Sequence, residues 1–425
     1  MAIQWDISTL GNGMRIVTTP VPTAQSVSVN VFFGVGSRNE AARTNGISHF
    51  IEHMLFKGTE RRPDATMIAE AIEGAGGVLN AYTSKELTCY WNQVPFDRLP
   101  IAIDVLADMC RHSLLDAAEI ARERTVVQQE LRRSFDQPGA WASELLGRAT
   151  FGDQPIGWPV GGTLDTVEEL QRDDFTEHIA TYYTPSNSVL SVAGNTTHEE
   201  VLQLAGDAFG DLPDRPAPAP PPAKAEFAGE RVVIEKRDIA QCHLGIALYA
   251  LPRRDPQRYA LTVLNTILGR GMSSRLFREV RERRGLAYSI GSGAARYNDI
   301  GTMSISAGVT LEKLEEATQV IRDELLKLAA AAPDDDETAR ARDFATGTFR
   351  LGLESTMALA QRAGESLLMT GEVEPIDEVV AATAAVQPAD VQRLAGQLFR
   401  PGAFSAALVG PGGDADRLRA ILDAA

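Results

Sequence analysis

The chain is poor in cysteine, in positive charge and in long apolar runs. Its 425 residues include three cysteines, Cys89, Cys110 and Cys242, which are too few and too scattered for a disulfide framework or a CxxC metal site. A formal net charge of −16 argues against nucleic acid as a partner, because phosphate binding needs a basic surface. No apolar stretch approaches the roughly 20 residues that cross a bilayer, so no membrane partner is expected.

A targeting segment is also missing from the start of the sequence. Residues 1–10 contain no basic segment followed by an apolar run, and strand-like sequence begins almost at once. Together with the unclustered cysteines, this predicts a cytoplasmic protein. An apolar fraction of 44% is typical of a folded globular chain, and the length exceeds one ordinary core, so we expect at least two domains.

One proline-rich segment, Pro213–Pro222, separates two similar halves. The helix start at Asp116–Glu119 is repeated at Asp334–Glu337, and a strand at Ser188–Gly194 is echoed by Phe404–Gly410. The offset is domain-sized and indicates a duplication rather than a short repeat. We predict an N-terminal domain over 1–211, a linker over 212–229 and a homologous domain over 230–425.

Hydrophobic periodicity predicts the fold class. An Asn-Gly hairpin at 10–14 and alternating strands over 15–19, 27–33, 78–82 and 87–91 are mixed with long helices, such as one from residue 116 to 131. This mixture is typical of an α+β fold. We therefore expect two homologous α+β domains, in which antiparallel-rich sheets pack with helices.

The most informative stretch is residues 46–58, which read as an amphipathic helix. Its apolar residues recur at helical spacing, while His49, Glu52 and His53 share a different face. We expect Asn45 to cap the start of this helix and Gly58 to mark its end.

The H-x-x-E-H order of this face predicts a metal site. Two imidazoles one turn apart can hold one zinc ion, and the carboxylate beside them can accept a proton from metal-bound water. A histidine on a half-apolar helix is more often an ordinary structural residue. With only six histidines in the chain, however, two at this spacing around a glutamate favour the metal interpretation. Such a site needs a third protein ligand and one open position.

A wider set of motifs resembles the M16 peptidases, the inverzincin family that includes pitrilysin, insulin-degrading enzyme and the mitochondrial processing peptidase. These motifs are His49–His53 followed by Glu130, and the segments at Asn80–Lys85, Glu123–Glu130 and Gly271–Phe277. The resemblance covers essentially the whole chain. At this length it is greatest to the short bacterial M16B members and the processing-peptidase subunits.

The resemblance implies a role for each matching residue. It makes His49, His53 and Glu130 the ligands of one Zn²⁺ per chain, Glu52 the general base, and Glu123 a carboxylate that supports the site from the same helix as Glu130. Without the family match, the two helix glutamates would be interpreted as a solvated face. The second half has Ala341 and Thr348 at the corresponding helix positions, and its counterpart of the metal helix, 260–268, has no histidine. We expect no metal site there.

Further residues are matched to substrate binding. Arg281 and Tyr288 resemble the family's substrate-contacting pair, although the sequence alone would suggest an ordinary basic helix end. Asn80 and Ala81 lie in a predicted strand that resembles the one receiving peptide by β-augmentation; the alternative is an ordinary edge strand. A turn at 269–274 lacks the lysine of a phosphate-binding loop.

These expectations combine into one functional prediction. The resemblance implies a zinc endopeptidase that hydrolyses unfolded peptides in a clamshell chamber. For a chain of this length that chamber is expected to be formed by a homodimer, with Arg281 and Tyr288 acting in trans. Two alternatives remain open: a catalytically silent structural subunit of the same fold, and an obligate heterodimer partner. Presequence processing is not predicted, because Glu144 is only a weak candidate for an acidic residue lining the cleft.

Overall fold

A computed structural model describes residues 3–227 and 229–424. These residues form two compact units, each with its own sheet and core. The first unit comprises the residues up to Leu131, Trp158–Pro221 and Arg350–Ile376. The second comprises Arg132–Gly157, Pro222–Phe349 and the residues from Asp377 onward.

The first unit contains a six-stranded sheet in the order β1-β2-β6-β3-β5-β4. Its strands are β1 (Asp6–Thr9), β2 (Arg15–Pro20), β3 (Ser26–Phe33), β4 (Val78–Thr83), β5 (Thr88–Pro95) and β6 (Ser188–Gly194). Only β2 and β6 pair in parallel, and every other pair in this sheet is antiparallel. The predicted Asn-Gly hairpin is confirmed: it joins β1 to β2, with Gly13 at a φ of +94° that favours glycine.

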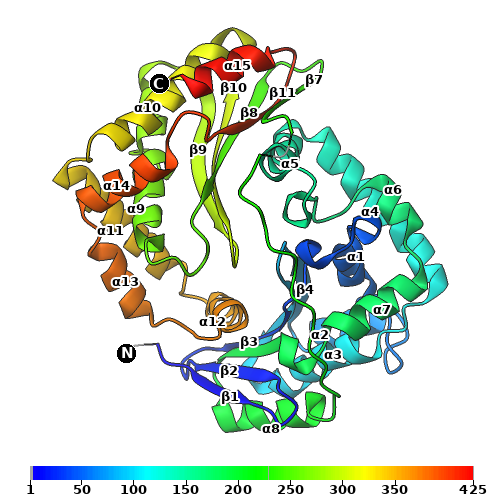
Figure 1. Cartoon of the computed structure of the whole chain (residues 1–425). Coiled ribbons are helices and arrows are strands. Elements are labelled where there is room, and N and C mark those ends of the chain that lie inside the picture. The colour runs from blue at the N-terminus through cyan, green and yellow to red at the C-terminus, as the bar shows by residue number, and fades with distance from the viewer. Residues whose placement is uncertain (1–2, 228, 425) are drawn as a thin grey trace. The chain divides into compact units, whose positions relative to one another are not determined.

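One face of this sheet is covered by helices from the same half of the chain (Figure 1). Helices α1 (Ile47–Met54), α2 (Ala65–Glu73), α3 (Leu99–His112) and α8 (His198–Phe209) contact its strands. Helices α4 (Ala117–Asp136), α6 (Leu164–Glu169) and α7 (Arg172–Tyr182) add buried residues to the same core. Helix α4 starts where the capping pattern predicted, with the Asp116 carboxylate accepting from the backbone of Ala118 and Glu119.

The second unit repeats this topology in a five-stranded sheet of order β7-β11-β8-β10-β9. Its strands are β7 (Val232–Lys236), β8 (Cys242–Ala250), β9 (Ala287–Arg296), β10 (Gly301–Val309) and β11 (Ser405–Gly410). Strands β7 and β11 are parallel, as β2 and β6 are, and the remaining pairs are antiparallel. The predicted α+β class with a repeated topology is confirmed.

Helices of the second half cover one face of this second sheet. Helices α9 (Arg258–Gly269), α14 (Pro388–Leu398) and α15 (Ala415–Asp423) contact its strands, and α10 (Leu314–Ala330) and α11 (Asp335–Leu351) add buried residues to the same core. The second half also forms α13 (Ile376–Ala384) and a π-helical segment at Phe277–Arg283. In the part of the chain that the structure describes, no helix combines the length and apolarity needed to cross a membrane.

The other face of each sheet is covered by a helix from the opposite half of the sequence. Helix α5 (Pro138–Phe151) precedes the linker but packs on β8 and β11, whereas α12 (Thr356–Thr370) follows it and packs on β2, β3 and β6. The central strands are buried on both faces, so each sheet needs cover on both sides. The two helices are counterparts, because Pro138 to Thr356 spans the same 218 residues as Ala117 to Asp335.

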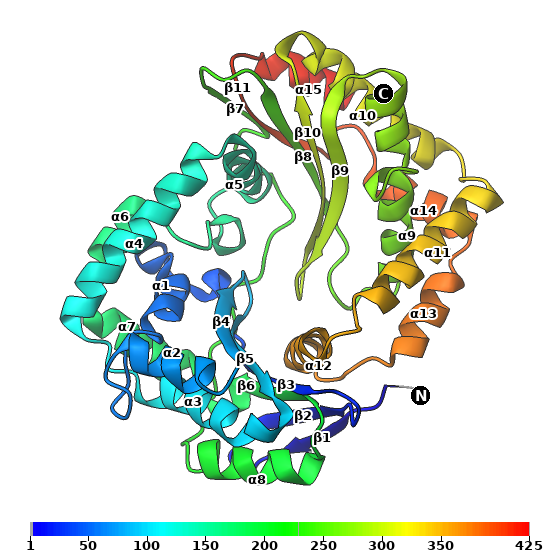
Figure 2. The same cartoon turned by 180° about the vertical axis from the view of Figure 1, so that it is seen from behind.

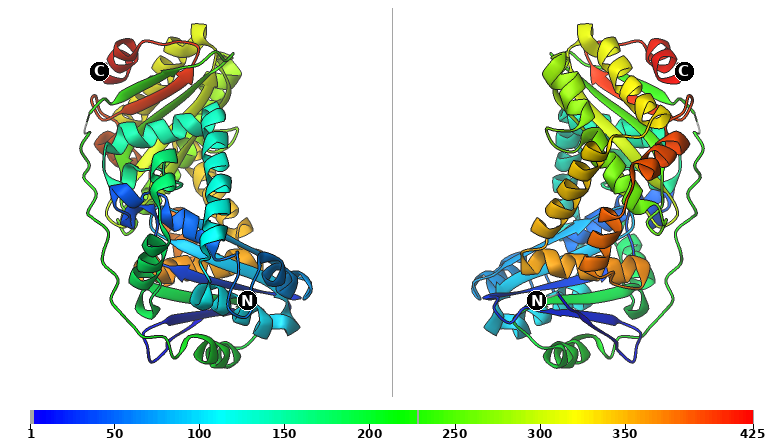
Figure 3. Two further views of the ribbon diagram at one scale, coloured as in Figure 1. Left: turned by 90° about the vertical axis from the view of Figure 1, so that its right-hand side faces the viewer. Right: turned by 90° about the vertical axis from the view of Figure 1, so that its left-hand side faces the viewer.

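This exchange changes the domain description. The predicted ranges 1–211 and 230–425 are continuous, whereas each compact unit takes one helical segment from the other half. The predicted linker contains the division between Pro221 and Pro222. Its proline-rich part, 213–222, has neither helix nor strand and runs as extended chain (Figure 3).

The close approach of α12 to the sheet gives a test of the exchange. A Cβ at Gly364 would lie 2.2 Å from a ring carbon of the buried Phe32, so Gly364→Ala should overpack this contact and cost about 2 kcal/mol of stability. Gly206 on α8 is a matched control, because a Cβ there meets nothing within 4 Å and alanine favours the helix. We expect thermal unfolding to show a lower midpoint for Gly364→Ala and an unchanged or higher one for Gly206→Ala. Equal midpoints would contradict the tight packing of α12.

Candidate metal centre

Helix α1 separates an apolar side from a polar side, as its sequence predicts. Ile47, Phe50, Ile51 and Met54 are at most 1% exposed and pack in the core of the first unit. His49, Glu52 and His53 are only partly buried and lie on the other side. Burial of the stripe therefore determines which way the three polar side chains point.

The start of α1 differs from the prediction. Gly46, at a φ of +97°, precedes the first turn, and Asn45 does not cap it. Instead, the buried Glu40 carboxylate accepts from the backbone N–H groups of Gly46 (2.7 Å) and Ser48 (2.9 Å) and from the Asn45 amide (2.8 Å). Burial raises the pKa of Glu40, and these hydrogen bonds counter part of the rise. This cap could not be predicted from the sequence, because Glu40 lies outside the register of a local capping motif.

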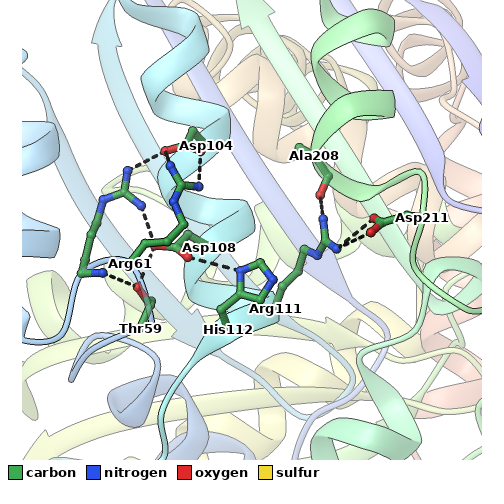
Figure 4. Close-up of polar contacts among 9 residues, drawn as sticks. Thr59, Arg61, Asp104, Asp108, Arg111, His112, Ala208 and Asp211 are labelled. Carbon is green, nitrogen blue, oxygen red and sulfur yellow. Dashed lines mark hydrogen bonds and ion pairs between the residues drawn. The ribbon is translucent and has the colours of Figure 1, made fainter.

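Helix α1 also ends earlier than predicted. The helix ends at Met54, so Gly58 lies beyond it and beyond the turn that follows, with a φ of +134°. The next segment is anchored to α3: the Thr59 hydroxyl donates to the buried Asp108 at 2.7 Å, and Arg61 pairs with Asp104 at 2.6 Å (Figure 4). Polar contacts thus hold the start of α1 and the segment that follows its end.

Three predicted ligands converge at the polar side of α1. The Nε2 atoms of His49 and His53 are 3.3 Å apart, and a carboxylate oxygen of Glu130 on α4 lies 3.7 Å and 3.4 Å from them. Within residues 3–227 and 229–424, this is the one group of three or more His, Cys, Asp or Glu side chains placed to share a metal ion. The 76 residues between His53 and Glu130 are bridged by the packing of α4 beside α1.

These separations fit a zinc ion. Four ligands at zinc–nitrogen and zinc–oxygen bond lengths in a tetrahedron are about 3.3 Å apart. Two imidazoles and one carboxylate also leave the fourth position open, as in catalytic sites. The chemistry and spacing of the donors therefore suit a divalent metal.

The protonation of His49 supports the same interpretation. Burial, and then the charge of His53, lowers the pKa of His49 to about 4, so His49 is neutral at neutral pH and offers a lone pair. Its Nδ1 is buried and has no hydrogen-bond partner among the described residues. Burial alone would lower the pKa of His53, but the hydrogen bond that its ring donates to Glu123 and the nearby carboxylate charges raise it overall.

Glu123 lies on α4, seven residues before Glu130, and contacts His53. Its carboxylate lies 2.9 Å from His53 Nδ1, so an Nδ1–H donated to it leaves Nε2 free for the metal. Its other oxygen pairs with Lys57 Nζ at 2.6 Å. Burial would raise the pKa of Glu123, but the contacts with His53 and Lys57 lower it. Sequence reasoning missed Lys57, because α1 has already ended and no helical spacing relates it to Glu123.

Glu52 faces the end of strand β4. The Thr83 hydroxyl donates to Glu52 Oε2 at 2.6 Å. Burial raises the pKa of Glu52, the Thr83 hydrogen bond opposes the rise, and the net shift is upward. A carboxylate with a raised pKa is a better proton acceptor near neutral pH. Thr83 was not predicted, although it lies in the same strand as Asn80 and Ala81.

Asn80 and Ala81 lie on β4, which is the last strand in the order of the first sheet (Figure 2). One edge of β4 pairs with β5, and no strand of the described chain pairs with the other edge. Asn80 is exposed, and its side-chain oxygen accepts from the N–H of Ala81. The strand is therefore an edge strand, which both interpretations of these residues required.

Arg281 and Tyr288 belong to the second unit, and their relation to the metal ligands stays a prediction. Within that unit they lie together: the Arg281 guanidinium is 5.7 Å from the centre of the Tyr288 ring and 4.8 Å from that of Phe277. Tyr288 is 78% exposed. The counterparts of the helix glutamates carry no ligand, since Ala341 is buried and the Thr348 hydroxyl donates to the backbone of its own helix.

Two family profiles match successive parts of this chain, and curated relatives match nearly all of it. The family profile described as "Insulinase (Peptidase family M16)" matches residues 15–164, and that described as "Peptidase M16 inactive domain" matches residues 169–344. An uncharacterized zinc protease of Streptomyces coelicolor is 40% identical over 412 residues, covering 95% of this chain and 89% of the relative. The uncharacterized zinc protease YmxG of Bacillus subtilis is 37% identical over 406 residues, covering 96% and 98%.

Solved structures share the fold. A protease from Helicobacter pylori has a TM-score of 0.88 at 23% identity, covering 96% of this chain and 99% of that one. A chain of complex III2 from Candida albicans has a TM-score of 0.85 at 19% identity, covering 98% and 99%.

The cap formed by Glu40 gives a stability prediction. Glu40→Ala removes the acceptor of three buried donors, and the loss should be about 3 kcal/mol. Glu60 is exposed and has no such bonds, so Glu60→Ala should stay within about 0.5 kcal/mol of wild type. Chemical denaturation of both variants measures the difference. A Glu40→Ala protein as stable as Glu60→Ala would show that α1 does not depend on this carboxylate.

Proposed function

Because this chain belongs to the M16 peptidase family, we propose that it is a zinc-dependent endopeptidase that hydrolyses unfolded peptides. The observation that carries the proposal is the convergence of His49, His53 and Glu130, with Glu52 on the same face of α1. The names of the relatives, which are zinc proteases, support the same metal and the same class of reaction.

The proposed chemistry assigns one step to each group. A bound zinc ion would lower the pKa of a coordinated water and polarise the scissile carbonyl. Glu52 accepts the proton of the attacking water and returns it to the nitrogen of the leaving amine. Glu123 holds the His53 ring through Nδ1.

Substrate binding is proposed to use the free edge of β4. A peptide that adds to this edge at Asn80 and Ala81 is bound through its backbone, which gives affinity with little sequence selectivity. Only an extended segment can pair in this way, so folded proteins are poor substrates. Arg281 would hold a substrate carbonyl, and the Tyr288 hydroxyl would donate to the developing oxyanion.

We place the Arg281 and Tyr288 pair in trans, within a chamber formed by a homodimer. The exposure of Tyr288 and the absence of ligands in the second half support this division of labour. We also propose a cytoplasmic location, which the three free cysteines support.

A structural subunit is the second candidate, favoured by the similarity in fold to a chain of complex III2. The complete ligand set in this chain favours the enzyme. An obligate heterodimer would also need a separate partner for activity. Metal analysis of the purified protein separates the enzyme from the structural subunit, and activity at the mass of a homodimer excludes the heterodimer.

The role of Glu52 can be tested directly. Glu52→Gln should keep about one zinc per chain but lose about 10³-fold in turnover of an internally quenched peptide, because the amide cannot accept the proton. Elemental analysis measures the zinc, and Glu60→Gln serves as an exposed control that should retain full activity. Removing zinc with a chelator should abolish wild-type turnover, and adding zinc back should restore it. A fully active Glu52→Gln enzyme would refute the assigned mechanism.

The trans arrangement predicts complementation between two inactive variants. In a mixed dimer, the zinc half of an Arg281→Ala subunit faces the intact Arg281 and Tyr288 of a Glu52→Gln subunit. Mixing equal amounts under conditions of subunit exchange should therefore restore about a quarter of wild-type activity, because half of a random mixture is hybrid and each hybrid has one intact site. Each variant mixed with itself is the control. No recovery in a mixture shown to contain hybrids would place the pair in cis.

A further inference from the structure

The Glu52 carboxylate has one hydrogen-bond donor among residues 3–227 and 229–424, the hydroxyl of Thr83. The bond is short, with 2.6 Å between Thr83 Oγ1 and Glu52 Oε2. Oxygen Oε1 of the same carboxylate accepts no hydrogen bond from the described residues. The two oxygens therefore differ: one is engaged, and the other is free to accept a proton.

Thr83 donates its one hydroxyl proton to Glu52. Its other polar neighbour is Thr88 Oγ1, at the much longer distance of 3.5 Å. Thr88 in turn donates its own proton to the carbonyl of Val35 at 2.9 Å. Since a hydroxyl has one proton, Thr88 cannot donate to Thr83 as well, and Thr83 gives its proton to the shorter bond.

The position of this hydroxyl is determined by the sheet. Thr83 is the last residue of β4, it pairs with Thr88 on β5, and the next backbone N–H, that of Ser84, bonds to Leu87. A β-branched side chain in such a strand has few rotamers. Glutamate, by contrast, has a broad terminal torsion and would rotate without a partner.

We infer that Thr83 is a positioning residue: its hydroxyl holds Oε2 of Glu52, so that Oε1 is presented to the attacking water. The inference rests on the proposed function for the role of Glu52. It also connects that residue to the strand proposed to bind substrate, because Thr83 lies two residues after Ala81 in β4. A peptide added to the edge of β4 and the proton acceptor are then held by the same strand.

Isosteric substitution isolates the hydroxyl. Thr83→Val keeps the shape of the side chain and removes the donor, whereas Thr83→Ser keeps the donor. Because a small misplacement of a reacting group can cost about 10²-fold, we expect kcat to fall between about 10-fold and 100-fold in Thr83→Val. We expect KM within about twofold of wild type, because peptide binding at β4 uses the backbone. Zinc content should be unchanged, and Thr83→Ser should recover most of the lost kcat.

Thr9 provides a matched control. It is the last residue of β1, which forms the opposite edge of the same sheet, and it is exposed. Thr9→Val should leave kcat and KM unchanged. A fall in kcat that Thr83→Ser does not reverse, or an equal fall in Thr9→Val, would assign the effect to sheet structure and overturn the inference.

A crystallographic comparison gives a readout that does not depend on activity. In metal-free crystals of the wild-type protein, the Glu52 carboxylate should have one orientation with Oε2 against Thr83, and in Thr83→Val it should turn or become disordered. An unchanged orientation in Thr83→Val would overturn the inference whatever the enzyme does. If wild type cleaves peptides, Glu52→Gln is inactive and Thr83→Val keeps its kcat, only the positioning role fails. If wild type cleaves no peptide, the proposed function fails, and the crystal structures alone decide what Thr83 does.

Discussion

The candidate site depends first on the burial of one side of α1. Ile47, Phe50, Ile51 and Met54 are removed from water by the core of the first unit, and a rotation of the helix would expose them. Burying each such side chain contributes about 2 kcal/mol, so the rotational setting of α1 is strongly determined. Because the apolar side chains of α1 must face the core, His49, Glu52 and His53 face the opposite side of the helix. The chemistry of the site is in this sense a consequence of hydrophobic packing.

Polar contacts then determine how the side chains of this polar face are oriented. Glu40 holds the start of the helix, Glu123 orients the His53 ring, and Thr83 holds one oxygen of Glu52. Each comes from a different segment: a loop before α1, the helix α4 and the end of strand β4. The ligands need such partners, because an imidazole or a carboxylate on a helix otherwise has more than one rotamer available.

The difference between helix packing and polar contacts from other segments explains which features could be predicted from the sequence. The polar face of α1 and the shared face of Glu123 and Glu130 follow from helical periodicity, and the repeated topology follows from matching segments in the two halves. Glu40, Lys57 and Thr83 could not be found in this way, because they meet their partners through loops and strand ends for which sequence spacing carries no rule. The prediction that Asn45 caps α1 is wrong for the same reason. Capping rules consider only residues next to the helix, whereas the cap here is the Glu40 carboxylate from an earlier loop.

The exchange of α5 and α12 between the two halves could not be predicted from the sequence either. Neither helix has a sequence that specifies which sheet it covers. The consequence of the exchange bears on why the second half persists without ligands. The far face of the first sheet, with Val17 and Phe32, is covered by Ala363 and Leu367 of α12, which is encoded after the linker. The first half alone would expose that face to water, so the sheet that carries Thr83 and contacts α1 depends on sequence far from the site. The second half, which has no counterpart of the ligand set, therefore contributes a structural element to the unit that holds the candidate metal centre.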